Sequence, residues 1–411
     1  MENNKKPKIR FKGFTDDWEQ RKLGEIADSF GYGLNVAAKT YDGINKYIRI
    51  TDIDDESRSY KEEDLKSPDC DLYNAERYRL EKGDILFART GASVGKTYIY
   101  NNSNEIIYFA GFLIRAKIRK CFSSDFIFFN TLTCKYKKFI NIISQRSGQP
   151  GVNAQEYAEF EISLPVIKEQ NQIGNLFQKL DHLIALHQRK YDKLVNVKKS
   201  MLEKMFPKNG ETKPEIRFKG FTDDWEQRKL GEIAEETFGG GTPNTYCEAY
   251  WKGSIPWIQS SDLCEDKVFG VLGYKKISHL GIINSAAKII PENSIAITTR
   301  VGVGKLSLIE HEYSTSQDFL SLSKLKIDER LATYLIYKKM KADAHLLQGT
   351  SIKGITKNEV LSKSLFVPKR IDEQNQIGNF FQKLDNLIAL HQRRLEKLKN
   401  IKKSFLENMF V

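Results

Sequence analysis

The residues whose types and spacing come nearest to a ligand-binding motif form the Gly-rich run TGASVGKT, Thr90–Thr97. A P-loop has four residues between its two glycines, then Lys and Ser or Thr, and it opens a helix whose N–H groups hold phosphate. Here three residues separate Gly91 from Gly95, and the following run TYIYN is typical of a strand. The sequence therefore predicts a tight Gly-rich turn between strands, with Lys96 and the equivalent Lys305 exposed near its tip, and no ATP site.

Other motifs of catalysis and metal binding are missing. The chain has no GxGxxG that opens a βαβ unit, no HExxH and no adjacent prolines, so the (N/D)PP(Y/F) loop of amino-methyltransferases is excluded. The five cysteines are scattered without a CxxC pair, which favours free thiols in a reducing cytosol over disulfides or a zinc site. We therefore expect no catalytic residue, no metal and no cofactor on this chain, and a cytoplasmic location.

Length and charge limit the classes of protein that remain. With 411 residues, 40% of them hydrophobic, the chain can form two or three globular domains, and no apolar run approaches the ~20 residues of a membrane helix. The 65 Lys and Arg residues outnumber the 53 Asp and Glu residues, which gives a net charge of +12. This balance favours a polyanionic partner, most often nucleic acid, although charge alone leaves open a basic protein that binds none.

The chain is a two-fold internal repeat, which is its strongest signal. The segment IRFKGFTDDWEQRKLGEIA occurs at Ile9–Ala27 and again, unchanged, at Ile216–Ala234. A second pair of segments, Glu169–Phe206 and Glu373–Phe410, is identical at 29 of 38 positions. Because near-identical ends flank dissimilar middles, the sequence predicts one fold built twice, with a shared framework and divergent recognition surfaces.

The dissimilar middles keep three common landmarks and have the pattern of a mixed α/β fold. YIRITDI matches WIQSSDL, GDILFARTGASVGK matches NSIAITTRVGVGK, and SGQPGVN matches GTSIKGIT. β-Branched and aromatic runs predict strands at 86–90, 97–101 and 105–118. Helical periodicity predicts amphipathic helices at 125–144 and 329–348. We therefore expect a mixed α/β (α+β) fold in each half.

Each copy of the second repeated segment has the pattern of a coiled-coil helix. Apolar residues recur at alternating steps of four and three, and each helix is roughly 55 Å long at about 1.5 Å per residue. The seam and partner-interface positions are Ile173, Phe177, Leu180, Ile184 and His187 in the first copy and Ile377, Phe381, Leu384, Ile388 and His391 in the second. We expect the two helices to pair antiparallel, with polar seam residues, including Lys198 and Lys402, fixing their register.

These paired segments give the chain a resemblance to a known family. It resembles the DNA-specificity subunit of type I restriction–modification systems over nearly its whole length. The resemblance lies in the W-x-x-x-x-L-G-E-I segments Trp18–Ile26 and Trp225–Ile233, the loops before Pro165 and Pro368, and the paired EQNQIGNxFQKLDxLIALHQR helices. It implies two target-recognition domains that each read half of a bipartite double-stranded DNA site, held apart by two long helices. It also implies partners that carry the chemistry: two adenine-N6 methyltransferase subunits and motor-nuclease subunits, which would bind S-adenosylmethionine, ATP and Mg²⁺.

The domain boundaries follow from the repeat. We expect a first target-recognition domain at 1–168, a first coiled-coil helix at 169–206, a linker at 207–215, a second target-recognition domain at 216–372 and a second helix at 373–411. The alternative is a coiled-coil adaptor that binds only protein and has no sequence-selective DNA binding. An enzyme with a site of its own is opposed by the missing motifs.

DNA contacts are expected from polar side chains on Gly-punctuated loops, because Arg and Lys favour guanine or phosphate and Asn and Gln favour adenine. The candidates are Arg89, Thr90, Lys96, Arg146, Gln149 and Asn153 in the first half and Gln259, Arg300, Lys305, Gln317, Lys353 and Lys357 in the second. Each of these can equally be an ordinary solvated side chain. Trp18 and Trp225 are expected in the core.

Overall fold

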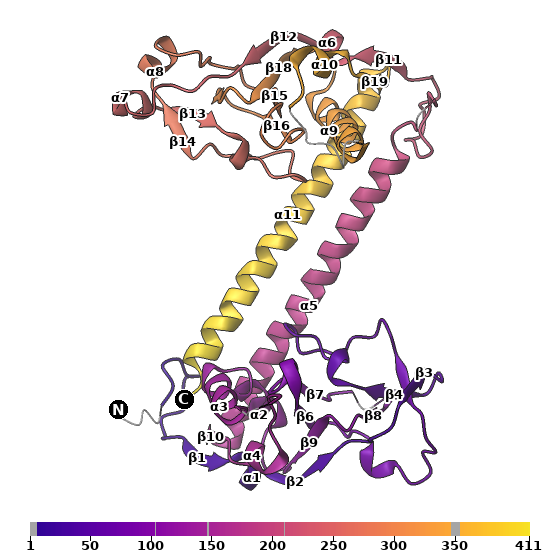
Figure 1. Cartoon of the computed structure of the whole chain (residues 1–411), viewed down its shortest axis with the longest axis vertical. Helices are drawn as coiled ribbons and strands as arrows, with labels where there is room; N and C mark the ends of the chain where they lie inside the picture. The colour runs from indigo at the N-terminus through magenta and orange to yellow at the C-terminus, as the bar shows by residue number, and fades with distance from the viewer. Residues whose placement is uncertain (1–5, 103, 146–147, 209, 347–353) are drawn as a thin grey trace. The chain divides into compact units, whose positions relative to one another are not determined.

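The computed structural model describes residues 6–102, 104–145, 148–208, 210–346 and 354–411. The chain forms two compact units, one made of residues 1–188 with 393–411 and the other of residues 189–392. Two helices of 38 residues each, α5 (Ile167–Lys204) and α11 (Ile371–Asn408), contribute to both units (Figure 1). Each unit therefore combines a globular body with one part of each long helix.

The shorter elements of the first unit mix strands and helices, which confirms the predicted fold class. They are β1 (Glu19–Lys22), α1 (Leu23–Ile26), β2 (Ala27–Tyr32), β3 (Ala38–Thr40), β4 (Asn45–Ile48), β5 (Lys66–Pro68), β6 (Ile85–Ala88), β7 (Thr97–Ile99), β8 (Ile106–Phe109), β9 (Leu113–Ile118), α2 (Ser124–Asn130), α3 (Cys134–Ile143), α4 (Ala154–Ala158) and β10 (Glu161–Leu164).

The second unit repeats this order with few changes. Its shorter elements are β11 (Glu226–Lys229), α6 (Leu230–Ile233), β12 (Ala234–Gly239), α7 (Glu248–Trp251), β13 (Ile255–Ile258), β14 (Lys275–Ile277), α8 (His279–Ile283), β15 (Ser294–Thr298), β16 (Leu306–Ile309), β17 (Ser314–Thr315), β18 (Phe319–Leu325), α9 (Glu329–Leu346), α10 (Lys357–Ser362) and β19 (Ser364–Val367).

Each unit is built on the same four-stranded antiparallel sheet. The strand order is β2-β9-β6-β7 in the first unit and β12-β18-β15-β16 in the second, so corresponding strands occupy corresponding places. Smaller strand pairings accompany this sheet: β3–β5 and β4–β8 in the first unit, and β14-β13-β17 in the second. One small pairing in each unit is parallel, β4 with β8 and β13 with β17. The two halves therefore share a topology and differ in the details of the smaller strands.

The central strand of each main sheet is buried on both faces. In β6, Ile85 and Phe87 pack among the side chains of α2, α3 and the long helices, whereas Leu86 and Ala88 pack against the smaller strands. The residues of β15 divide between two clusters in the same way. A strand covered on both faces is a continuous apolar run rather than an alternating one, which is the pattern that β6 has in the sequence.

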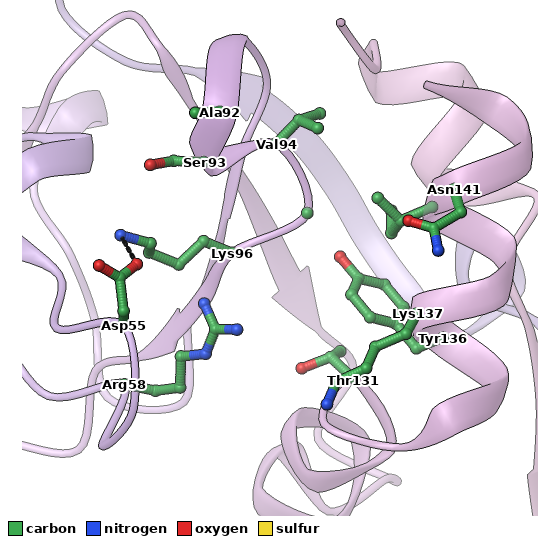
Figure 2. A pocket seen from close by; sticks show the side chains of 12 residues that line it. Asp55, Arg58, Ala92, Ser93, Val94, Lys96, Thr131, Tyr136, Lys137 and Asn141 are labelled. Atoms are coloured by element: carbon green, nitrogen blue, oxygen red, sulfur yellow. Dashed lines mark ion pairs between the residues drawn. The ribbon is translucent and has the colours of Figure 1, made fainter. Parts of the chain in front are cut away.

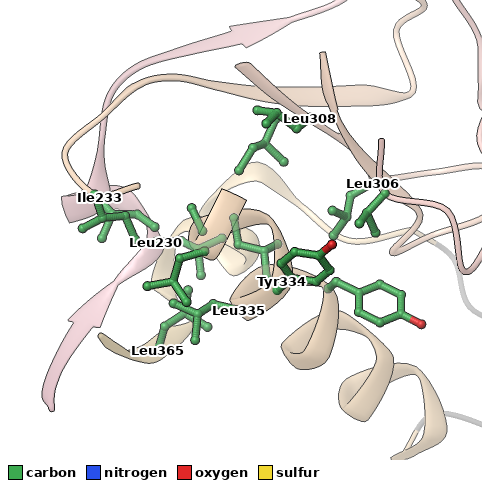
Figure 3. Packing of buried hydrophobic residues seen from close by; sticks show 14 of the residues in the cluster. Leu230, Ile233, Leu306, Leu308, Tyr334, Leu335 and Leu365 are labelled. Carbon is green, nitrogen blue, oxygen red and sulfur yellow. The ribbon is translucent and has the colours of Figure 1, made fainter. Parts of the chain in front are cut away.

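The helical side of each sheet holds the largest core. Figure 3 shows this core in the second unit, where Tyr334 of α9 lies near Leu306 of β16 and Leu335 lies beside Leu365 of β19. The two tryptophans of the repeated segment belong to these cores. Trp18 is 4% exposed and Trp225 is 2% exposed, so their predicted core position is confirmed.

The long helices pack antiparallel within each unit, as predicted. In the first unit the start of α5 meets the end of α11, where the rings of Phe177 and Phe410 are 5.5 Å apart. In the second unit the end of α5 meets the start of α11, where the rings of Phe206 and Phe381 are 5.5 Å apart. Seam residues near the globular bodies are buried, and those nearer the helix centres are half-buried. The buried set is Ile173, Phe177, Leu180, Ile377, Phe381 and Leu384, and the half-buried set is Ile184, His187, Ile388 and His391.

The two repeated segments of each half contact each other through the same three side chains in both units. We call this set the bracket: Arg10, Glu169 and Gln170 in the first unit and Arg217, Glu373 and Gln374 in the second. The Arg10 guanidinium makes a bidentate ion pair with Glu169, with both nitrogen–oxygen distances at 2.8 Å. Arg217 pairs with Glu373 in the same way, at 2.6 and 2.8 Å. Glu169 is 0% exposed and Glu373 is 1% exposed. Replacing either the Arg or the Glu alone would leave a buried charge unpaired. The segments IRFKGF and EQNQIG therefore depend on each other.

The residue after each glutamate completes the bracket. The side chain of Gln170 accepts a hydrogen bond from Ser123 N at 3.1 Å and donates one to the Pro165 carbonyl at 2.8 Å. Gln374 makes the equivalent two bonds in the second unit. These contacts fix the start of each long helix against the globular body that precedes it.

Two predicted elements are broken in the structure. The helix predicted at 125–144 is two helices, α2 and α3, because Thr131 and Thr133 donate to carbonyls of the preceding turn and Thr133 then caps α3. The strand predicted at 105–118 is two strands, β8 and β9, separated around Gly111. α5 begins and ends two residues before its predicted limits, and α11 begins two and ends three residues before its own. None of the described helices is apolar enough over a sufficient length to span a membrane.

Candidate nucleic-acid interface

The Gly-rich run of the first unit is a turn between β6 and β7, as predicted. Gly91 and Gly95 have φ values of 72° and 80°, a left-handed conformation that favours glycine. A Cβ on Gly95 would lie 2.6 Å from the Ile140 side chain, so the turn packs closely on α3. Tyr157 holds it there, because its hydroxyl donates to the Ala88 carbonyl at 2.6 Å and accepts from Gly95 N at 3.1 Å.

The lysines that follow these turns do not have the predicted exposure. Lys96 is only 6% exposed; its Nζ donates to the Ile53 carbonyl at 3.1 Å and lies 2.5 Å from Asp55 Oδ1. Lys305 is half-buried, and its Nζ donates to the Leu263 carbonyl at 3.3 Å. The prediction that both amines are exposed near a loop tip is therefore wrong, because each ties its turn to the end of the first landmark segment. Their contact with DNA stays a prediction.

Three of the other candidates in the first unit gather around this turn. Arg89 is half-buried with its guanidinium 5.1 Å from the Tyr32 ring centre, and Thr90 pairs with Gly151 in an isolated β-bridge. Gln149 is exposed and lies over Gly91, where an added Cβ would be 2.9 Å from its amide nitrogen.

Two first-unit candidates have other outcomes. Asn153 is the N-cap of α4, and its side-chain oxygen accepts a hydrogen bond from Glu156 N at 2.9 Å. That oxygen is therefore already used within the fold. Arg146 lies outside the described residues.

The candidates of the second unit are more scattered. Arg300 is exposed beside the equivalent turn, which is held by a hydrogen bond from Ile355 N to the Thr299 carbonyl at 2.8 Å. Gln317 is exposed and accepts from Thr242 at 2.5 Å. The remaining positions are Gln259, which caps a short 3-10 turn, Lys357, which is exposed at the start of α10, and Lys353, which lies outside the described residues.

A polar pocket lies between the Gly-rich turn and α3 in the first unit (Figure 2). Its volume is about 180 Å³. The lining side chains with polar groups are Asp55, Arg58, Ser93, Lys96, Thr131, Tyr136, Lys137 and Asn141. Sequence reasoning selected only Lys96 from this set. The others come from segments far apart in the chain, and no local pattern marks them.

Two polar groups in this pocket have no hydrogen-bond partner among the described residues. The Arg58 guanidinium makes no hydrogen bond or ion pair, and burial lowers its pKa against the opposing influence of Tyr136 and Asp55. Tyr136 is 2% exposed, and burial raises its pKa well above the usual range. Its hydroxyl faces that of Tyr157, which already bonds to Ala88 and Gly95, and finds no partner there in full hydrogen-bond geometry. The hydrogen bond from Lys96 lowers the pKa of Asp55, which keeps that carboxylate ionised.

The described residues contain no group of three or more His, Cys, Asp or Glu side chains that could hold a metal ion. All five cysteines lie in the described part of the chain and are free thiols there. The geometry is that of two similar frameworks, each carrying different polar loops.

Comparison with known proteins decides the family. A model of the type I restriction modification DNA specificity domain matches residues 15–196 and 222–400, once in each half of the chain. The chain belongs to this DNA-specificity family. Its paired repeats are therefore the two specificity domains of one subunit, and its role is that of a specificity subunit rather than an enzyme or a protein-only adaptor.

Individual relatives agree with the family model. The MjaX specificity subunit, assigned to a type I restriction enzyme of Methanocaldococcus jannaschii, is 26% identical over 427 aligned residues, covering 98% of this chain and 95% of that one. The EcoR124I/EcoR124II specificity subunit of Escherichia coli is 28% identical over 211 residues, covering 46% of this chain and 50% of that one. The crystal structure of a type I restriction–modification S subunit from M. genitalium has the same fold, with a TM-score of 0.63 over 99% of both chains at 13% identity.

Proposed function

We propose that this specificity subunit reads a bipartite double-stranded DNA target, with one half-site read by residues 1–168 and the other by residues 216–372. The observation that supports this most directly is the repeated framework. Both units have the same main sheet and the same bracket of Arg, Glu and Gln, yet the loops around their Gly-rich turns carry different side chains. Two similar scaffolds that carry different loops are suited to recognise two different DNA half-sites.

Base and phosphate contacts belong to the loop side chains in this proposal. The exposed candidates Gln149, Arg300, Gln317 and Lys357 are free to approach a duplex, and Arg89 with Thr90 lies next to Gln149. Arg contacts to guanine and Gln contacts to adenine supply base discrimination, whereas lysines contribute phosphate contacts. The net charge of +12 supports the sequence-independent part of the affinity.

The helices at 169–206 and 373–411, with the linker at 207–215, serve in this proposal as the spacer between half-sites and as the docking surface for two methyltransferase subunits. A chain that repeats its framework offers similar surfaces to two identical partners. Restriction subunits then join the complex in the cytoplasm. S-adenosylmethionine, ATP and Mg²⁺ belong to these partners.

A domain exchange tests the two-module function. Replacing Ala27–Pro165 with the corresponding stretch of another specificity subunit should change one half of the DNA target and leave the other half and the spacer unchanged. The readout is selection from random duplexes by the complex with its methyltransferase subunits. The matched control exchanges the corresponding stretch of the second unit, which should change the other half only. A change in both half-sites from one exchange would contradict two independent modules, and a complex without sequence preference would favour the adaptor alternative.

A further inference from the structure

We propose that the pocket between the Gly-rich turn and α3 of the first unit is a phosphate-binding site. The pocket sits beside the turn that carries Arg89 and Thr90, so in the assembled complex its ligand is a backbone phosphate of the DNA. That last step rests on the proposed function, whereas the binding of a phosphate group does not.

The charges of the pocket favour an anion. Arg58, Lys96 and Lys137 face one carboxylate, Asp55, which leaves an excess of two positive charges. Lys96 already has an ion pair and a carbonyl partner, but Arg58 has neither among the described residues. A half-buried guanidinium has lost water without gaining a partner, and a phosphate can accept two parallel N–H bonds from it.

The backbone conformation of Arg58 and the hydroxyl of Tyr136 also favour a bound phosphate. Arg58 has a φ of 59°, a left-handed conformation that is uncommon for a residue other than glycine and that clusters at functional sites. Figure 2 shows the Tyr136 hydroxyl directed toward the space between the turn and the Arg58 side chain. This buried hydroxyl has only the already engaged Tyr157 hydroxyl beside it and no partner in full hydrogen-bond geometry, so a phosphate oxygen would give it a better acceptor.

Asp55 acts as an internal competitor for the ligand. Its side chain is 82% exposed and holds the Lys96 ammonium at 2.5 Å. A phosphate that enters the pocket takes over this ammonium, and the exposed carboxylate turns away to water. Removal of the Asp55 charge should therefore strengthen phosphate binding, while removal of the Arg58 charge should weaken it.

Among the described residues, the second unit has no counterpart of Arg58, which provides an internal comparison. Counting forward from the matched landmark segments, Val268 stands in the place of Arg58 and is 1% exposed in the hydrophobic core. The nearby cation Lys341 already pairs with Asp266 at 2.8 Å. The pocket is therefore a property of the first unit and contributes to one half-site only.

The first experiment measures binding of inorganic phosphate to the full chain by calorimetry at low ionic strength. Wild type should bind one phosphate, Arg58→Ala should weaken binding at least ~10-fold, and Asp55→Asn should strengthen it. Arg119→Ala is the control, because this arginine lies outside the pocket and pairs with Asp28 on the surface. Equal affinity in wild type and Arg58→Ala, or no binding to either, would overturn the proposal.

A conservative variant separates ligand binding from folding. Tyr136→Phe keeps the buried ring and removes the unpartnered hydroxyl, so the melting temperature without phosphate should rise. The increase in melting temperature caused by added phosphate should become smaller. A hydroxyl with a purely structural role would leave that increase unchanged, which would count against the site.

The second experiment identifies the source of the phosphate. In the complex with methyltransferase subunits, Arg58→Ala should reduce the slope of log affinity for DNA against log salt by about one, equally for all target sequences. If phosphate binding is lost but the slope is unchanged, the site is retained and its ligand is free phosphate. A wild-type complex without selective DNA binding would refute the proposed function, while the phosphate titration would still judge the pocket.

Discussion

An ion pair connects the long helices in each unit. Lys402 of α11 lies 2.5 Å from Asp181 of α5, and Lys198 of α5 lies 2.6 Å from Asp385 of α11. Both lysines were expected on the seam as polar residues that set the register, and each meets an aspartate of the other helix. Burial raises the pKa of Asp181, and the nearby Lys402 opposes this shift. The buried surroundings therefore disfavour the charged form of Asp181, and the pair has a role other than stabilising that charge. It restricts the register because a shifted helix would leave two half-buried charges unpaired.

Removing one member of this pair should be worse than removing both. Asp181→Leu leaves the Lys402 ammonium without its partner and should lower the free energy of unfolding by about 1–3 kcal/mol, less than for a fully buried pair. Asp181→Leu combined with Lys402→Leu should be close to neutral or stabilising. Denaturant unfolding of the four members of the mutant cycle measures the coupling, and Asp385 with Lys198 offers the same cycle in the second unit. Additive effects in both cycles would show that the pairs do not act together.

The two cations of the second Gly-rich turn have different surroundings. Arg300 is exposed, whereas the Lys305 ammonium donates to the Leu263 carbonyl, so we expect different roles for them. Arg300→Ala should reduce the salt dependence of DNA binding by about one phosphate contact with little effect on stability. Lys305→Met should lower the melting temperature, because the Leu263 carbonyl loses its donor, and should leave the salt slope nearly unchanged. Salt titrations and thermal melts of both variants test this, and the reverse pattern would restore Lys305 as the contact.

At the scale of elements, glycines allow the long helices to start close to their neighbours. A Cβ at Gly378 would lie 2.3 Å from Asp328 Oδ1, and that oxygen accepts from Leu331 N at 2.8 Å to cap α9. A Cβ at Gly174 would approach Asp125 Cβ to 3.0 Å, which a small shift can relieve.

The two alanine variants should therefore differ. Alanine gains about 1 kcal/mol of helix propensity at either site. At Gly378 this gain should be outweighed by displacement of the Asp328 cap, giving a net loss of about 1 kcal/mol. At Gly174 the net change should be near zero. Denaturant unfolding of the two variants compares them directly, and equal effects would show that the cap is not disturbed.

Sequence periodicity predicted the long helices to within two or three residues at each end, because a heptad pattern sustained over 38 residues leaves little freedom in where the helix lies. It could not predict the break between α2 and α3, since Thr131 and Thr133 interrupt an otherwise continuous apolar pattern through local side-chain hydrogen bonds. The same limit applies to the pocket. Arg58 and Tyr136 are brought together only by tertiary packing, and Lys96 was misjudged because its carbonyl partner lies 43 residues away.

At the scale of the whole molecule, the repeated framework accounts for the family more strongly than any single residue. The specificity-domain model matches each half separately, and each half has its own sheet, core and bracket. The candidate DNA contacts are not part of that framework. This division explains why the family could be inferred from the repeated segments while the loop residues stay predictions, since readout depends on side chains that the scaffold does not constrain.

The first repeated segment docks on a helix end in the same way in both units. Ile216 N donates to the Lys204 carbonyl at 2.9 Å, and Ile9 N donates to the Asn408 carbonyl at 2.9 Å. Eleven residues connect Lys204 to Ile216, and the residues after Asn408 together with those before Ile9 also number eleven. The same docking contact is therefore made at both joints between a long helix and the first repeated segment.

A circular permutant should consequently fold without a designed linker. Val411 is fused directly to Met1, and new ends are opened within residues 207–215. The permutant should keep the melting temperature of the parent to within a few degrees and select the same DNA target with its methyltransferase subunits. A permutant opened inside β6 should fail to fold and serves as the control. Loss of folding with the first cut would show that the two joints are not equivalent. Retained folding would show that the two docking contacts are interchangeable.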